Sequence, residues 1–214
     1  MKKIIIGARG SKLSLWQANW VRERLAEKLP GLELELEIIR TEGDERHDLA
    51  PGAFGREGIF TAELDRALLD RRIDLAVHSL KDLPTRLAPG LALAAITERG
   101  PASDLLLVRA EHAGAEDLLD RDDLDLTIGT SSFRRIAQLK HRFPGLKFAP
   151  LRGNLDTRLR KLGEGKHQAI VVARAGLERL GLEPAPHRMI ELPLEIMLPA
   201  AGQGALAVET RADD

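Results

Sequence analysis

Short apolar segments alternate along the chain with amphipathic ones, and glycine, proline or hydroxyl residues separate them. Apolar runs and period-two alternation predict strands, whereas apolar residues three or four positions apart predict helices. The predicted strands span residues 3–8, 33–39, 75–79, 91–97, 105–108, 126–129, 147–150, 169–173, 190–192 and 205–209. The predicted helices lie between residues 11 and 30 and at 60–69, 132–143, 154–162 and 175–180. This alternation predicts an α/β protein with mostly parallel sheets and helices on both faces.

The first predicted helix begins after Ser11, whose hydroxyl suits an N-cap, and it ends before Pro30. Its apolar side is expected to consist of four residues, Leu13, Trp16, Trp20 and Leu25. Two segments lack such periodicity. Residues 41–58 combine acidic clusters with glycines and predict a loop, and residues 115–125 predict an acidic helix-and-loop connection.

Changes in composition around residues 98–103 (ERGPAS) and 199–204 (PAAGQG) indicate that the chain crosses between two domains. We expect domain 1 to contain residues 1–98 and 204–214, and domain 2 residues 103–198. The crossover segments would then be 99–102 and 199–203.

The composition is that of a soluble globular protein, with 43% hydrophobic and 30% charged residues among 214. Apolar runs fall far short of a membrane span, and the initial run of three isoleucines fits a first strand better than a signal peptide. We therefore expect a cytoplasmic monomer that does not bind membranes. The absence of cysteine excludes disulfides and thiolate chemistry, and the six scattered histidines predict no metal site.

Positive charge is concentrated in residues 129–160, which hold eight Lys or Arg and a single acid, Asp156, in a chain of net charge −1. The segment twice follows the order strand, tight turn, helix. Backbone N–H groups and arginines at such helix starts suit carboxylates or phosphates. Nucleic-acid binding through this segment is a weaker alternative, because aromatic residues are few and the rest of the chain is acidic.

Polar side chains follow several predicted strands directly, where a parallel sheet binds its ligands. They are Arg9 and Ser11, Lys81 and Asp82, Thr130 and Ser131, and Arg152. Asp82 suits the stabilisation of a cation, although a surface turn before Pro84 is the alternative. His78 is either a packed strand residue or a catalyst, and the former is the more common role.

The turn at residues 129–132 either caps the following helix or binds an anion. Arg134 and Arg135 favour the anion, because two cations in a first turn oppose the helix dipole and no acid lies between Asp125 and Asp156.

The second turn, Arg152-Gly153-Asn154, repeats this arrangement, with Asn154 as N-cap and Arg158 one turn inside the helix. Arg152 and Arg158 are predicted to bind anions, although an arginine beside an apolar stripe is often only a surface residue.

Several segments, in order from end to end, closely resemble porphobilinogen deaminase, a family also called hydroxymethylbilane synthase. They are GARGSKLSLWQA (7–18), VHSLKDLP (77–84), GTSSFRR (129–135), LRGNLDTRL (151–159) and PAAGQGALAVE (199–209). The resemblance implies a two-lobed architecture like that of type II periplasmic binding proteins, with two crossovers.

The resemblance also implies a transferase of tetrapyrrole and haem biosynthesis. It would join four porphobilinogen units head to tail, with release of ammonia, on a dipyrromethane cofactor. Asp82 would stabilise the pyrrole cation that remains after ammonia has left. The residues implied to hold carboxylates of cofactor and substrate are Arg9, Ser11, Lys81, Thr130, Ser131, Arg134, Arg135, Arg152, Gly153, Asn154, Arg158 and Arg179.

The sequence departs from the family pattern in several places. The family attaches its cofactor to a cysteine of a third domain, whereas this chain has no cysteine and matches only the first two domains. Ala53 and Glu57 stand where the family has loop lysines, and Ser103 stands where it usually has an arginine. We expect a chain that needs a separate C-terminal domain for turnover. The alternative is a two-lobed module that binds an anion or tetrapyrrole without turnover.

Overall fold

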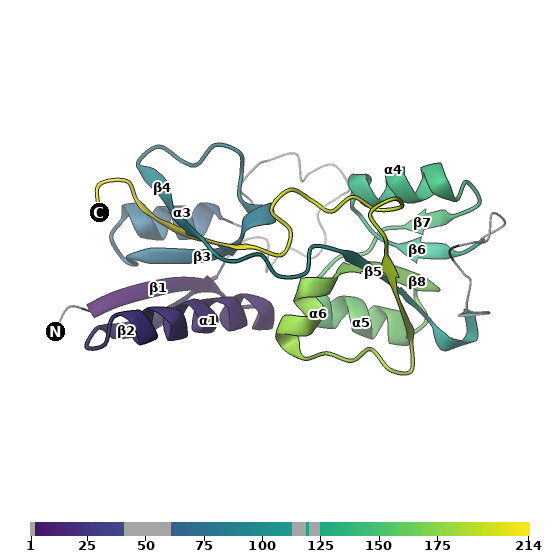
Figure 1. Cartoon of the computed structure of the whole chain (residues 1–214), viewed down its shortest axis with the longest axis horizontal. Coiled ribbons are helices and arrows are strands. Elements are labelled where there is room, and N and C mark those ends of the chain that lie inside the picture. The colour runs from purple at the N-terminus through teal and green to yellow at the C-terminus, as the bar shows by residue number, and fades with distance from the viewer. Residues whose placement is uncertain (1–2, 41–60, 113–118, 120–124) are drawn as a thin grey trace. The chain divides into compact units, whose positions relative to one another are not determined.

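The computed structural model describes residues 3–40, 61–112, 119 and 125–214, and the chain divides into two compact units (Figure 1). Unit 1 comprises residues 1–100 and 204–214, and unit 2 comprises residues 101–203. The predictions for residues 41–58, including Ala53 and Glu57, and for most of 115–125 lie outside the described residues.

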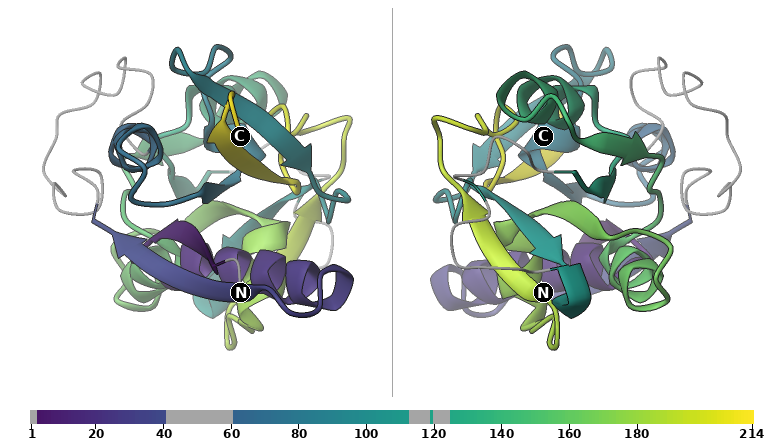
Figure 2. Two further views of the ribbon diagram at one scale, coloured as in Figure 1. Left: turned by 90° about the vertical axis from the view of Figure 1, so that its left-hand side faces the viewer. Right: turned by 90° about the vertical axis from the view of Figure 1, so that its right-hand side faces the viewer.

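Unit 1 is built on a five-stranded sheet in the order β2-β1-β3-β10-β4. Its strands are β1 (Lys3–Arg9), β2 (Glu33–Ile39), β3 (Leu75–Ser79), β4 (Leu91–Ile96) and β10 (Leu206–Arg211). Its helices are α1 (Lys12–Lys28), α3 (Ala62–Leu69) and the short η2 (Leu80–Asp82). Figure 2 shows β10, in yellow, beside β4.

Unit 2 repeats the plan with a sheet in the order β7-β6-β8-β5-β9. Its strands are β5 (Asp104–Val108), β6 (Thr127–Gly129), β7 (Lys147–Ala149), β8 (Ala169–Ala173) and β9 (Arg188–Leu192). Its helices are α4 (Phe133–Arg142), α5 (Leu155–Gly163), α6 (Arg174–Leu180) and the short η3 (Ala110–His112).

In each sheet one strand runs against the other four. This strand is β10 in unit 1 and β5 in unit 2, and each pairs antiparallel with both of its neighbours. The remaining strands are parallel to one another. The chain enters unit 2 through β5 and returns to unit 1 through β10. Neither strand therefore directly follows a helix of its own unit. The predicted fold class, α/β with mostly parallel strands, is confirmed.

Helices cover both faces of each sheet because the strands are apolar on both sides. On β1, Ile4 and Ile6 face the core under α1, while Ile5 faces the core under α3. In unit 2, α4 packs on one face, and α5 and α6 pack on the other (Figure 1). Because these strands are apolar on both faces, they stand out as short apolar runs in the sequence. The pattern therefore predicted their ends to within two residues.

The predicted buried face of α1 is wrong in part. Ala18 and Val21 form its buried centre, together with the polar Ser14 and Gln17, whereas Trp16 is half-buried. Trp20 and Leu25 pack at the margin of this core. The polar pair is buried because both side chains hydrogen-bond to the strand ends, which an apolar periodicity does not reveal.

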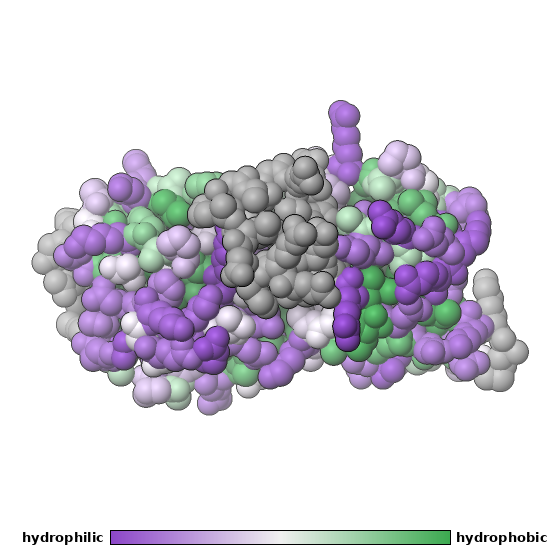
Figure 3. Space-filling model, turned by 180° about the vertical axis from the view of Figure 1, so that it is seen from behind, coloured by the Kyte–Doolittle hydropathy of each residue, from purple (hydrophilic) through white to green (hydrophobic). Residues whose placement is uncertain are grey.

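Hydrophilic side chains cover much of the face seen in Figure 3, and apolar residues form small patches among them. Among the described residues, no helix has the length and apolarity needed to cross a bilayer.

Candidate functional site

The end of β1 and the start of α1 are joined by two hydroxyl groups. Ser11 is the N-cap of α1 as predicted, since its hydroxyl oxygen accepts the N–H of Ser14 at 3.2 Å. The Ser14 hydroxyl in turn accepts the N–H of Arg9 at 3.0 Å. These bonds place Arg9 and Ser11 at the carboxyl end of β1, in half-buried positions.

The end of β3 is tied to the same helix. Gln17 Nε2 donates to Ser79 Oγ at 2.8 Å, and the N–H of Leu80 donates to the carbonyl of Ala205 at 3.1 Å. The chain then forms η2, which carries Lys81 and Asp82. Asp82 is exposed and Lys81 is half-buried.

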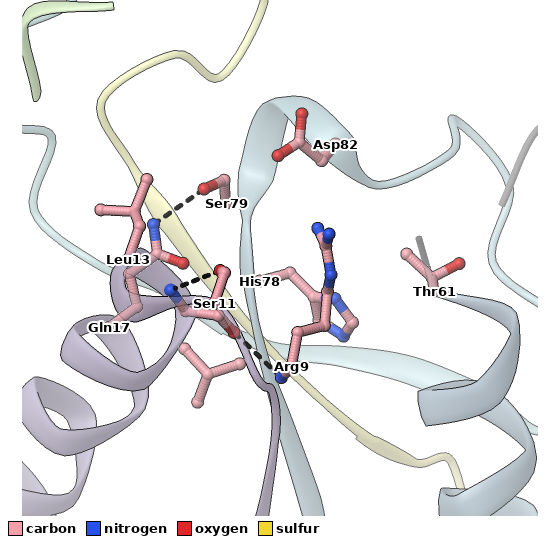
Figure 4. A pocket seen from close by; sticks show the side chains of 10 residues that line it. Arg9, Ser11, Leu13, Gln17, Thr61, His78, Ser79 and Asp82 are labelled. Carbon is pink, nitrogen blue, oxygen red and sulfur yellow. Dashed lines mark hydrogen bonds between the residues drawn. The ribbon is translucent and has the colours of Figure 1, made fainter. Parts of the chain in front are cut away.

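A pocket of about 70 Å³ lies at these strand ends, entirely within unit 1 (Figure 4). Arg9, Ser11 and Asp82 line it, so the structure brings together three of the four predicted unit 1 residues. Lys81 does not line it. The remaining polar lining residues are Ser14, Gln17, Thr61, His78 and Ser79. Only His78 among them was considered from the sequence, and it is a buried strand residue that also lines the pocket.

In unit 2, the predicted turn at the start of α4 is braced by hydroxyl groups. Thr130 is buried, its N–H donates to the carbonyl of Ala149 at 2.9 Å, and its Oγ1 accepts the N–H of Ser132 at 3.2 Å. Ser131 Oγ exchanges two 3.2 Å hydrogen bonds with the backbone of Leu151. The hydroxyls therefore join the turns after β6 and β7.

Arg134 and Arg135 have an internal counter-charge, contrary to the sequence argument. Arg134 Nη2 and Arg135 Nη2 each lie 2.7 Å from a carboxylate oxygen of Asp104, which is fully buried. Burial alone would raise the pKa of Asp104, but the charges and hydrogen bonds of Arg135 and Arg134 outweigh it and hold the pKa below its usual range. Asp104 is distant in sequence, so a search of the local segment missed it.

Asp104 also receives a hydrogen bond from Gln203 Nε2 at 3.0 Å, and the same amide donates to the carbonyl of Ala102 at 2.7 Å. Arg134 reaches the carbonyl of Leu198 with Nη1 at 2.5 Å. Through Asp104 and Leu198, the two arginines therefore contact residues near the start and near the end of unit 2. The Arg134 side chain is 26% exposed and that of Arg135 is 7% exposed, so Arg134 is the more accessible to a ligand.

At the second turn, Asn154 is the N-cap of α5 as predicted, because its Oδ1 accepts the N–H of Thr157 at 3.0 Å. Gly153 has a φ of +105°, and a Cβ there would lie 2.6 Å from Thr157 Cγ2. Arg158 Nε donates to the Gly153 carbonyl at 2.8 Å and braces the turn. Arg152 is half-buried at the same turn.

Arg179 lies on α6, apart in sequence from both turns, and its burial lowers its pKa. The Ser103 side chain hydrogen-bonds to Glu191 and so helps to lower the pKa of that carboxyl group. Among the described residues, no group of three or more His, Asp or Glu is arranged to hold a metal ion.

Known proteins give a consistent result for the whole chain. A family model described as "Porphobilinogen deaminase, dipyromethane cofactor binding domain" matches residues 4–214. The chain belongs to the porphobilinogen deaminase family. It is 47% identical over 213 residues to porphobilinogen deaminase of Nostoc sp., and 49% identical over 217 residues to that of Gloeobacter violaceus. Both alignments include the whole of this chain. They include only 65% and 64% of the respective relatives, so the chain spans just under two thirds of their length.

Solved structures share the fold of this family member at low sequence identity. The BenM effector-binding domain with benzoate has a TM-score of 0.59 at 16% identity, covering 99% of this chain and 84% of that one. An ancestral cationic amino acid solute-binding protein has a TM-score of 0.55 at 13% identity, covering 99% and 83%. They support the two-lobed, periplasmic-binding-protein-like fold of type II.

Proposed function

We propose that this chain provides the substrate-binding and reacting residues of a porphobilinogen deaminase. The whole protein would join four porphobilinogen units head to tail, release ammonia at each step and yield hydroxymethylbilane. The observation that carries this proposal is the pocket of unit 1, where Arg9, Ser11 and Asp82 line one cavity at the ends of β1 and β3. A cationic side chain, a hydroxyl and a carboxylate there match a substrate that has carboxylates and releases an amine.

Each pocket residue has a distinct part in this reaction. Arg9 pairs with an acetate or propionate group, for which a guanidinium offers two parallel donors. When the C–N bond of the aminomethyl group breaks, nitrogen keeps the electron pair and positive charge remains on the pyrrole. Asp82 stabilises that charge without needing to transfer a proton. Ser11 donates a hydrogen bond, and Lys81 adds positive charge nearby.

The residues of unit 2 hold further carboxylates in this proposal. Arg152, Arg158 and Arg179 supply guanidinium groups, and Thr130, Ser131, Gly153 and Asn154 shape the two turns. Arg134 and Arg135 already neutralise Asp104. Arg134 retains accessible N–H donors for a ligand, whereas Arg135 acts chiefly by keeping Asp104 ionised.

Dipyrromethane, named in the family description, fits this donor set by its charge. Arg152 and Arg158 would hold its carboxylates, and the group would supply the pyrrole carbon on which the chain grows. A thioether to this chain is excluded, since it contains no cysteine. We therefore infer that the thiol comes from a separate C-terminal domain, which would be the partner of this chain.

The second candidate function is a binding module that holds an anion or tetrapyrrole without turnover. The missing thiol favours it. Asp82 favours the enzyme, because a module that only binds carboxylates gains nothing from a carboxylate in its pocket.

One experiment separates the two. The chain is incubated with porphobilinogen, with and without a separately produced C-terminal domain of a relative that carries the cysteine. Ammonia release and tetrapyrrole absorbance are followed. We expect turnover only with the added domain. Binding of porphobilinogen without turnover in either mixture would support the module, and no binding at low salt would contradict both functions.

A further inference from the structure

A buried pair of titratable groups lies directly behind the pocket of unit 1. His78 lines the pocket from β3, and its Nε2 lies 3.1 Å from Oε2 of Glu209 on β10. Their side chains are 4% and 1% exposed. Because Ala207 pairs with His78 in the sheet, Glu209 lies two residues further along β10 on the same face. The two atoms are close enough for an ion pair but make no hydrogen bond.

A third group approaches from α3. Thr61, which also lines the pocket, donates from Oγ1 to Oδ2 of Asp65 at 3.3 Å. Figure 4 shows Thr61, His78 and Arg9 among the side chains that line the pocket. Asp65 and Glu209 are therefore each separated from the pocket by one side chain. The other oxygen of Asp65 is buried without a hydrogen-bond partner.

The apolar core on this face is formed by other residues. Leu64 and Leu68 of α3 already fill the core on this face, and β4, which packs on α3, carries no charged residue. Burying ionisable groups costs more than packing apolar ones of similar volume. Such groups beside a pocket are more typical of a functional site than of a core.

The proton count of the group changes near neutral pH. Burial raises the pKa of Asp65 to about 6, Glu209 contributes to the rise, and the positive charge of His78 opposes it. On α3 itself, the Thr61 hydrogen bond lowers this pKa and Glu63 raises it. Among the described residues that line the pocket, Arg9 and Asp82 are the charged groups on its open side. Whatever the protonation of His78, loss of the Asp65 proton adds one negative charge behind the pocket wall.

We propose that Asp65, Glu209 and His78 form one charged group behind the pocket wall, and that its negative charge stabilises the cation formed in the pocket when ammonia leaves. This inference rests on the proposed function and adds a source of negative potential besides Asp82. Asp65 and Glu209 act through the pocket wall, so they are positioning residues rather than catalytic ones. In the step concerned, the C–N bond of the protonated aminomethyl group breaks, ammonia leaves with the electron pair, and the pyrrole keeps the positive charge.

The size of the effect follows from one charge acting across a side-chain layer. With an effective dielectric constant of about 40, between those of a protein surface and bulk water, a charge about 8 Å away corresponds to about a three- to tenfold change in rate. The rate of ammonia release should therefore rise with pH through about pH 6, as Asp65 ionises.

The first arm of the test uses the chain alone. NMR of ¹³C-labelled aspartate carboxyl groups reports the titration of Asp65 without any substrate. Glu209→Gln removes a negative neighbour and should move the titration midpoint of Asp65 to lower pH. His78→Gln removes a positive neighbour and should move that midpoint to higher pH. Asp70→Asn, at the exposed end of α3, is the matched control and should move nothing. Equal midpoints in all four proteins would contradict the electrostatic coupling of Asp65 to Glu209 and His78.

The second arm measures the pH dependence of ammonia release by the chain with its added C-terminal domain. Asp65→Asn should remove the limb near pH 6 and lower the rate at pH 8 about three- to tenfold. Glu209→Gln and His78→Gln should shift the limb in the directions seen by NMR. An unchanged pH profile in Asp65→Asn would contradict the proposed effect of Asp65 on the rate of ammonia release, while leaving the proposed function intact. Absence of turnover in every protein would contradict the proposed function and the proposed effect on the rate, while the NMR arm still decides whether the three residues are electrostatically coupled.

Discussion

Gln17 on α1 donates a 2.8 Å hydrogen bond from Nε2 to the hydroxyl of Ser79 at the end of β3. Gln17 is buried and both residues line the pocket, so this bond joins the helix after β1 to the strand that leads to Asp82. The bond fixes the position of α1 relative to the end of β3, where the pocket lies. It also explains why a polar residue occupies the buried face of α1.

Replacing Gln17 by Ala should therefore loosen the pocket. We expect a loss of about 1–3 kcal/mol in the free energy of unfolding, because Ser79 loses its partner and a small cavity forms. Urea denaturation measures this loss, and porphobilinogen binding should weaken in parallel. Glu23→Ala, on the exposed side of the same helix, should change neither. Equal unfolding free energies for Gln17→Ala and the parent chain would show that the bond does not stabilise the pocket.

Asp82→Asn should abolish ammonia release by the complemented chain while leaving porphobilinogen binding largely intact. The amide keeps the size of the carboxylate but cannot stabilise a developing positive charge. Because Asp82 is exposed, the free energy of unfolding should change by no more than about 0.5 kcal/mol. Single-turnover ammonia release and calorimetric binding are the two measurements. A comparable loss of binding and chemistry would make Asp82 a binding residue instead.

Asp104→Asn should destabilise unit 2 strongly. The substitution leaves Arg134 and Arg135 without their counter-charge beside a fully buried position, for which we expect about 3–5 kcal/mol. The folded-state pKa of Asp104 is lowered, so its contribution is present above the unfolded pKa of about 4 and is lost as pH falls below it. Thermal unfolding from pH 2 to 7 measures both effects.

Asp125 provides the matched control for Asp104, since its ion pair with Lys147 is exposed. Asp125→Asn should change the unfolding free energy by less than about 1 kcal/mol. If Asp104→Asn were as mild as this control, the Asp104 pair would be dispensable, and the two arginines would be free to serve a ligand.

The outcome at Asp104 shows where sequence reasoning stops. Strand positions were predictable because apolar periodicity is local, and the caps Ser11 and Asn154 were predictable because capping chemistry is local too. The partner of Arg134, Asp104, lies thirty positions away on strand β5. No local pattern marks Asp104, and only the sheet order brings it to α4.

The same limit applies to the candidate site. Arg9, Ser11 and Asp82 were predictable because each follows a strand, and parallel strand ends meet at one edge of a sheet. Glu209 was not, because β10 is the strand that runs against its neighbours, and the antiparallel register alone places Glu209 near His78. A titratable residue directly after the apolar run at residues 205–208 is the signal that could have singled it out.

Asp65→Asn should stabilise the chain, in contrast to Asp104→Asn, because burial raises rather than lowers the pKa of Asp65, to about 6. The folded state favours the protonated carboxyl group, so the parent chain loses stability as pH rises from the unfolded pKa of about 4 to the folded pKa of about 6. Asparagine does not ionise and avoids that loss. The difference in melting temperature should be small at pH 4, grow to a few degrees by about pH 6.5 and stay constant above it. Scanning calorimetry between pH 4 and 8, with Asp70→Asn as the exposed control, measures the difference. A constant difference across this range would show that Asp65 does not titrate as a buried carboxyl group. The charge of the group behind the pocket would then not change near pH 6.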